Sequence, residues 1–257
     1  MKRSIRLALA GFLAVVSVQQ VRAADQSTEL AKPGKQLFAD AFARTEMAPK
    51  WRVGKGFFTV KDGVVNIAEN PDDHHGAYAY VAPGFPYKDI VAEFQVKLDG
   101  ARSCSLMIND RNYKESHAGH ILKATLLPGK VNLADWKYGA MKNDIYEKMK
   151  DPKTTAEEKK QIRESIKNKS ADFKTDADLS QWHTVRVDVV GDEMLANIDG
   201  KPAAYLKSQG VDHPTKNAIG FEVGGKSVEL KDFKVFEATP DKAWAEHREA
   251  VVESLKK

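Results

Sequence analysis

The stretch that decides the fold is DIVAEFQVKL, residues 89–98. Every second side chain in it is apolar, and most of the side chains between are charged or carry an amide. The apolar set, which shares one face of an extended chain, is Ile90, Ala92, Phe94, Val96 and Leu98. A period of two residues is typical of a β-strand that buries one face and exposes the other. We therefore predict a half-buried strand over this segment.

Similar strand-like segments, separated by turn residues, follow one another from about residue 38 to residue 236. The pair Asp62-Gly63 lies between two of them, residues 57–60 and 64–67, and Asp-Gly between apolar runs is a strong hairpin signal. Few helical patterns occur between these segments, whereas a parallel α/β fold needs a crossover helix after each strand. The sequence therefore predicts an all-β fold built as a two-sheet antiparallel sandwich.

A charged segment, residues 143–169, interrupts the β pattern. Thr155 and Glu158 have the spacing of a helix capping box, and Ile162 and Ile166 form a thin apolar stripe at helical spacing. We predict a helical insertion over residues 141–170 that covers a sheet edge or one end of a cleft. The plain alternative is a charged loop helix that only contacts solvent.

The chain ends in a second helical pattern, residues 239–257. Thr239 is expected as the capping residue and Pro240 as the first helical residue, with the helix continuing from Ala243 to Leu255. The sequence thus predicts a C-terminal helix directly after the last strand.

The N-terminus has the pattern of a secretory signal peptide. Three basic side chains among the first six residues precede an apolar run over residues 7–18 and a small-residue motif that ends at Ala23. We predict a signal peptide over residues 1–23 and, from it, a periplasmic or secreted protein. No later run reaches the roughly 18 apolar residues of a membrane helix, so no integral membrane segment is expected after cleavage.

The composition and charge of the chain restrict the classes of molecule that it is expected to bind. Of the 257 residues, 42% are hydrophobic and 30% charged, which is ordinary for a globular protein. Four of the 40 Lys and Arg residues lie within residues 1–23, so 40 − 4 leaves 36, which equals the 36 Asp and Glu. Nucleic-acid binding needs an excess of positive charge, and we therefore expect no nucleic-acid partner. The single cysteine, Cys104, excludes an intrachain disulfide.

Five phrases in the sequence carry a resemblance to a known family. In chain order they are LFADAF, WRVGKGFFTVKDGVVNI, YKDIVAEFQVKLDGA, WHTVRVDVVGDEMLANIDGKPAAYL and IGFEVGGKSVELKDFKVFEA. Their succession resembles the 3-keto-disaccharide hydrolase domain family. The resemblance implies a concanavalin A-like jelly-roll domain over residues 37–238. The segment RSCSLMINDR, residues 102–111, replaces the family's more usual Asn-Ser-Gly stretch, which indicates a divergent member.

The resemblance also implies a function, namely an exported hydrolase-like domain that acts on 3-keto-glycosides or related sugars. The Glu-x-Asp-x-x-Glu motif of laminarinase-type glycosidases, which share this fold, is absent from the sequence. The chemistry implied instead is elimination, in which a ketone at C3 acidifies the hydrogen at C2 and a base removes it. Two alternatives stay open: a non-catalytic glycan-binding module, and an interaction domain that holds a partner with its insertion.

Elimination needs a base, an acid and a group that polarises the ketone, and histidine serves the first two roles near neutral pH. Asp110 ends one predicted strand, and the segment from His117 to His120 begins the next. If adjacent strands bring them together, these three residues are the candidate catalytic set. They are also candidate cation ligands, so the cofactor is left open with a divalent metal as the candidate. The plain alternative is a set of polar turn residues.

Carbohydrate is the expected ligand, and five further residues are candidates for binding it. They lie in polar loops or on strands where the cleft is expected, and they are His75, Arg111, Lys123, Asp135 and Trp136. Trp136 offers a flat apolar face for a sugar ring. The alternatives are charges on the sheet surface and an aromatic side chain in the core.

Overall fold

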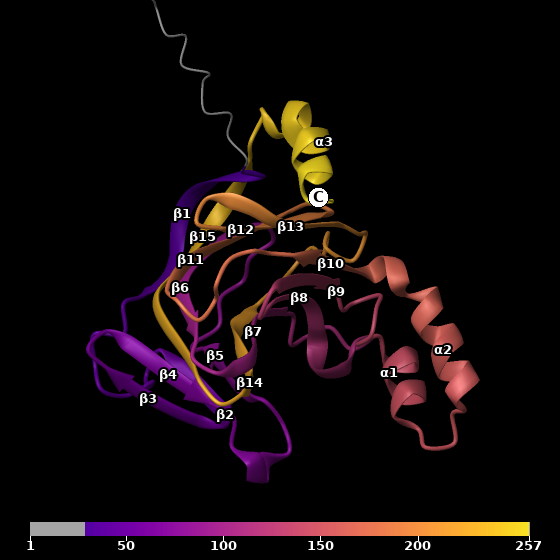
Figure 1. Cartoon of the computed structure of the whole chain (residues 1–257), viewed down its shortest axis with the longest axis horizontal. Helices are drawn as coiled ribbons and strands as arrows, with labels where there is room; N and C mark the ends of the chain where they lie inside the picture. The colour runs from indigo at the N-terminus through magenta and orange to yellow at the C-terminus, as the bar shows by residue number, and fades with distance from the viewer. Residues whose placement is uncertain (1–28, 257) are drawn as a thin grey trace, which may run out of the picture.

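The computed structural model describes residues 29–256, which form two antiparallel β-sheets stacked face to face with three α-helices outside them (Figure 1). The all-β, two-sheet sandwich predicted from the sequence is confirmed. The signal peptide predicted over residues 1–23 lies outside the described residues.

Sheet A contains eight strands. They are β1 (Ala31–Asp40), β3 (Phe57–Lys61), β4 (Val64–Ala68), β6 (Ile90–Leu98), β11 (His183–Val190), β12 (Glu193–Ile198), β13 (Lys201–Lys207) and β15 (Val228–Pro240). Their order across the sheet is β13-β12-β11-β6-β15-β4-β3, and β1 pairs with β15. The half-buried strand predicted over residues 89–98 is thus β6, a central strand, and the predicted hairpin is the pair β3 and β4.

Sheet B contains seven strands. They are β2 (Trp51–Lys55), β5 (Ala77–Val81), β7 (Ala101–Asn109), β8 (His120–Leu127), β9 (Lys130–Asp135), β10 (Ser170–Lys174) and β14 (Ala218–Gly225). Their order is β10-β9-β8-β7-β14-β5-β2. Strand β14 comes from a distant part of the chain and lies between β5 and β7, so residues near 220 are neighbours of both strands.

The core fills the space between the two sheets, and an aromatic cluster lies within it. Trp51 of β2 has its ring 6.0 Å from that of Phe221 and 5.6 Å from that of Phe233, between centroids. The indole N–H of Trp51 donates to a carboxylate oxygen of Asp40 at 2.7 Å, and Arg44 pairs with both oxygens of the same carboxylate. The one polar atom of the buried indole is therefore satisfied, as burial requires.

Two helices form the predicted insertion, α1 (Asn143–Lys150) and α2 (Ala156–Ser165), and both lie between β9 and β10 in the chain. The capping box that the sequence predicts at the start of α2 is present, with Thr155 and Glu158 each accepting from the other's backbone N–H. In Figure 1 the two helices project from one side of the sandwich. Short 3-10 turns occur at Pro71–Asp73, His117–Gly119 and Lys167–Lys169.

The C-terminal helix, α3 (Trp244–Ser254), begins later than the sequence predicts. Thr239 and Pro240 do not cap it, because they pair with β1 and so end strand β15. Trp244 and Val251 of α3 are buried against Leu195 on the outer face of sheet A, and this contact docks the helix on the sandwich. Within the described residues, every helix falls short of the length and apolarity needed to cross a membrane.

Candidate functional site

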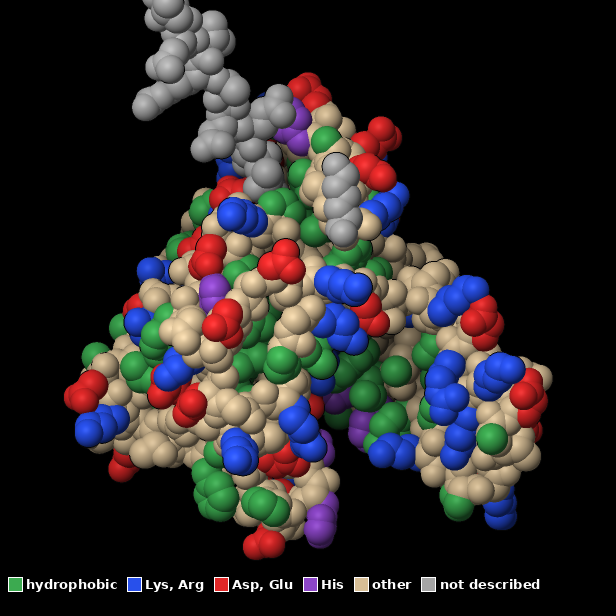
Figure 2. All heavy atoms as spheres, viewed as in Figure 1, with side chains coloured by type: hydrophobic (Ala, Val, Ile, Leu, Met, Phe, Trp, Pro, Cys, Tyr) green, Lys and Arg blue, Asp and Glu red, His purple; other side chains and the backbone are tan. Residues whose placement is uncertain are grey.

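A hollow lies between the sandwich and the helical insertion, and Figure 2 shows lysine and histidine side chains around it. We call this hollow the groove. Its floor is the face of sheet B that points away from the core. The side chains on and around this floor include Tyr80, Asn109, His120, Lys123, Trp136 and Glu222.

The alternation along β7 and β8 decides which side chains reach the groove. Leu106 and Ile108 of β7 and Leu122 of β8 belong to the buried core. The side chains that alternate with them, such as Asn109 after Ile108 and Lys123 after Leu122, therefore point to the opposite face. The register between the two strands shifts after Ile108, which places Asn109 opposite His120.

His120 is held by a hydrogen-bonded chain across three strands. The Nδ2 amide of Asn109 donates to the hydroxyl of Tyr80 at 2.8 Å, and Oδ1 of Asn109 lies 3.1 Å from Nδ1 of His120. Because this amide oxygen can only accept, Nδ1 of His120 carries the proton. The lone pair of the neutral ring is then on Nε2.

The surroundings of His120 keep its ring neutral. Burial, as the largest cause, and charge repulsion from the nearby His117, Lys123 and His75 together lower the pKa of His120 from 6.5 to about 4. At neutral pH the ring is therefore unprotonated and Nε2 can accept a proton.

Lys123 places a positive charge beside His120. Its ammonium nitrogen lies 3.3 Å from a carboxylate oxygen of Glu222 and 4.5 Å from the centroid of the Trp136 ring. The Trp136 ring in turn lies 4.8 Å from the His120 ring, edge to face. A proton acceptor, a cation and a flat apolar surface thus adjoin one another.

Three more of the predicted residues lie around this centre, and all three are exposed. The His117 ring lies 6.2 Å from the His120 ring and stacks on Tyr146 of α1 at 3.8 Å between centroids. The Arg111 guanidinium lies 5.6 Å from the centroid of the Tyr80 ring. His75 contacts Tyr78, at 5.4 Å between rings. The structure therefore gathers His75, Arg111, His117, His120, Lys123 and Trp136 in one region.

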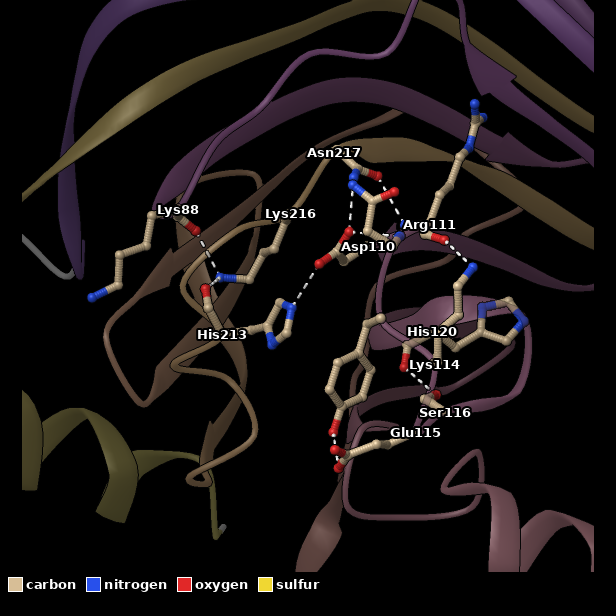
Figure 3. Close-up of polar contacts among 12 residues, drawn as sticks. Lys88, Asp110, Arg111, Lys114, Glu115, Ser116, His120, His213, Lys216 and Asn217 are labelled. Atoms are coloured by element: carbon tan, nitrogen blue, oxygen red, sulfur yellow. Dashed lines mark hydrogen bonds and ion pairs between the residues drawn. The ribbon is translucent and has the colours of Figure 1, made fainter.

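Asp110 does not join this group, contrary to the expectation from the sequence. Its carboxylate accepts from Asn217 Nδ2 at 2.7 Å and lies 3.1 Å from Nε2 of His213 (Figure 3). Asp110 and His213 point toward each other in this view, whereas His120 lies on the other side of Asp110. The strand ends at Asn109, so alternation no longer governs the direction of the next side chain. Asp110 organises a buried cluster behind the groove.

Asp135 is also misplaced by the sequence analysis, which put it on the groove face. It is fully buried, and its carboxylate accepts from the hydroxyl of Ser208 at 2.5 Å and from the N–H of Gly210 at 3.1 Å. Both partners belong to the loop after β13. A carboxylate committed to these donors stabilises the contact between sheet B and that loop, and it is not available to a ligand in the groove.

The cation site predicted from Asp110, His117 and His120 does not form. Among residues 29–256, no three His, Cys, Asp or Glu side chains come close enough to hold a metal ion together. The separation of Asp110 from His117 and His120 is one reason. Lys123 is the cation that the described residues place beside His120.

Four residues of the site were not predicted from the sequence, and they are Tyr80, Asn109, Glu222 and Tyr146. A signal existed for the first and third, since Tyr80 in AYAYV and Glu222 in GFEVG are the outward members of alternating runs. The contact of Asn109 with His120 depends on the register shift, and that of Tyr146 depends on how α1 folds back. The sequence indicates neither.

Comparison with known proteins gives one family. The profile described as a 3-keto-alpha-glucoside-1,2-lyase-like domain matches residues 33–236, which is most of the chain. No curated protein matches the sequence.

Solved structures with the same fold include a laminarinase from Rhodothermus marinus, with 11% identity and a TM-score of 0.56, over 82% of this chain and 100% of that one. A Bacillus subtilis protein of unknown function with a galectin-like fold has 15% identity and a TM-score of 0.53, over 82% and 100%. A carbohydrate-binding module from Bacillus subtilis has 10% identity and a TM-score of 0.50, over 73% and 96%. These likenesses establish the jelly-roll fold.

Proposed function

Because this chain belongs to the family of 3-keto-alpha-glucoside-1,2-lyase-like domains, we propose that it binds a 3-keto-glycoside in the groove and cleaves its glycosidic bond. The family gives the chain a carbohydrate-related function, and the substrate and the reaction are our proposal. The observation that carries the proposal is the neutral His120, whose Nδ1 is held by Asn109 so that Nε2 is left to accept a proton.

The proposed reaction begins at C2 of the sugar. Nε2 of His120 takes the C2 proton, which the neighbouring C3 ketone acidifies. The electron pair of the C2–H bond forms a C1=C2 double bond, and the C1–O bond breaks with its electrons on the leaving oxygen. His117 gives that oxygen a proton. Addition of water across the double bond completes a net hydrolysis.

Lys123 supplies the charge that this reaction needs. Removing the C2 proton places negative charge on the ketone oxygen, and a fixed cation near that oxygen stabilises it in a site partly shielded from water. The Lys123 ammonium lies over the Trp136 ring, 4.5 Å from its centroid, so a sugar ring that packs against the indole comes close to this cation. The geometry supports Trp136 as the binding surface and Lys123 as the polarising group.

Turnover of a 3-keto-disaccharide by the purified chain tests this proposal. His120→Asn keeps a donor for Asn109 but loses the proton acceptor, and we expect turnover to fall at least about 100-fold. His247→Asn on α3 is the matched control, because it removes a histidine far from the groove, and it should retain full activity. Retention of turnover in His120→Asn would contradict the proposal.

The alternative is a non-catalytic glycan-binding module. One observation favours it: Glu222 is paired with Lys123, so the floor of the groove lacks the free carboxylate pair of a classical glycosidase. Glycan binding by the wild type without turnover of any 3-keto-disaccharide would establish this alternative.

We also propose that the protein is exported to the periplasm or secreted, which the N-terminal pattern of residues 1–23 supports. Expression of the full chain in a bacterium, followed by fractionation and N-terminal sequencing, tests this. A mature N-terminus at Ala24 outside the cytoplasm is expected, and an intact N-terminus in the cytoplasm would contradict it.

A further inference from the structure

A second cavity adjoins the groove at the insertion. It has a volume of about 290 Å³ and lies between the strands β9 and β10 and the helix α2. Trp136 and Ala134 line it on the sheet side, and Arg163 and Ile166 line it on the insertion side. Its volume is close to the lower end of ligand pockets, roughly 300 Å³.

The charged side chains that line this cavity are mostly cations. Lys167 is paired with Glu164, and Lys169 lies 4.0 Å from the buried carboxylate of Asp135. Arg163 differs from them, because within residues 29–256 no hydrogen bond or ion pair engages its guanidinium. Figure 2 shows Lys and Arg side chains gathered on the insertion where it borders the hollow. The cavity therefore presents a guanidinium without a partner.

Trp136 connects the cavity with the candidate catalytic centre. Its ring contacts His120 and Lys123 on the groove side, and the same residue lines the cavity. A sugar ring that packs against Trp136 with its reacting carbons at His120 therefore lies next to the cavity that Arg163 lines. A substituent on that ring, or on the next ring, enters the cavity.

Guanidinium groups recognise planar or tetrahedral oxyanions through paired N–H donors, and this recognition is stronger than that of neutral hydroxyls. We propose that this cavity is a subsite for an anionic substituent, so that the substrate is an acidic saccharide carrying a carboxylate or a sulfate. The inference rests on the proposed function, since it takes the groove to hold a sugar. It adds the class of sugar and assigns Arg163 as the residue that selects it.

Binding of paired disaccharides tests the inference. Each pair consists of a neutral disaccharide and the same compound with either a C6 carboxylate or a C6 sulfate, and calorimetry gives the ratio of the two affinities. We expect the wild type to bind an acidic member at least tenfold more tightly than its neutral partner. Arg163→Gln should bring that ratio close to one and leave the affinity for the neutral member unchanged.

Lys160→Gln is the matched control. It removes one positive charge from the same helix, at an exposed residue that does not line the cavity, and should keep the preference. Preference for the carboxylate pair alone would support a uronic acid, and preference for the sulfate pair alone would support a sulfated sugar. A wild-type ratio near one in both pairs, or equal losses in Arg163→Gln and Lys160→Gln, would overturn the inference.

Turnover of the neutral 3-keto-disaccharide separates this inference from the proposed function. Turnover that depends on His120, together with no acidic preference, would overturn the acidic subsite alone. An acidic preference that depends on Arg163, without turnover, would overturn the proposed reaction and leave the subsite supported.

Discussion

The protonation of His120 should make the stability of the protein depend on pH. In the folded protein the pKa of His120 is lowered from 6.5 to about 4, first by burial and then by the charges of His117, Lys123 and His75. Between these two pH values the unfolded chain binds a proton that the folded protein does not. Stability is therefore fully present above pH 6.5 and falls as the pH drops toward 4.

The size of this effect follows from the two pKa values. One pH unit corresponds to about 1.4 kcal/mol, so the fall from 6.5 to about 4 amounts to roughly 3 kcal/mol for this one group. Burial lowers the pKa of His213 as well, so His213 also makes the free energy of unfolding fall as the pH drops. A comparison with a variant that lacks only His120 cancels that contribution.

Urea unfolding of the wild type and of His120→Asn at several values between pH 4 and pH 8 measures the effect. We expect the wild type to lose roughly 3 kcal/mol more than the variant over this range. Titration of the His120 ring by NMR gives the pKa directly. A measured pKa above 6, or the same pH dependence in both proteins, would refute the assignment of His120 as a neutral, shielded base.

Three further predictions concern other residues. Asp110→Ala leaves the buried groups around His213 without their acceptor and should lower the free energy of unfolding by about 3 kcal/mol in urea titrations; a loss below about 1 kcal/mol would contradict this. Trp136→Ala should weaken sugar binding about fivefold by calorimetry, in line with aromatic stacking of about 1 kcal/mol, and an unchanged affinity would exclude the indole as the binding surface. Tyr146→Ala removes the ring that stacks on His117 and should reduce turnover several-fold while changing the free energy of unfolding by less than about 1 kcal/mol, because α1 is an exposed helix. Full turnover in this variant would show that the stack does not position His117.

The sandwich was predictable because its strands carry their own signal. In β6 the inward side chains are apolar and most of the others are polar, so burial of one face follows from a few consecutive residues. The turn at Asp62-Gly63 likewise needs no distant contact. The order of the strands in each sheet, in contrast, depends on pairings such as that of β14 with β5, which join residues far apart in the chain.

The two misplaced carboxylates show where such local patterns stop being sufficient. Val131 and Leu133 point into the core, so the same alternation places Asp135 inward as well. The prediction from the sequence placed the Asp135 side chain on the surface instead, because it is charged. The partners that make its burial possible, Ser208 and Gly210, follow 73 and 75 residues later. No pattern near Asp135 in the sequence predicts these two contacts.

The position of the insertion has a consequence for the history of such a domain. α1 and α2 are attached where the chain passes from β9 to the outermost strand of sheet B, so a change in their length or composition disturbs no interior strand pairing. Relatives that keep His120, Asn109 and the stack of Tyr146 on His117 can therefore exchange the rest of this appendage for a longer, shorter or oppositely charged one. The reaction and the selectivity for a substrate would then evolve at different rates among these relatives.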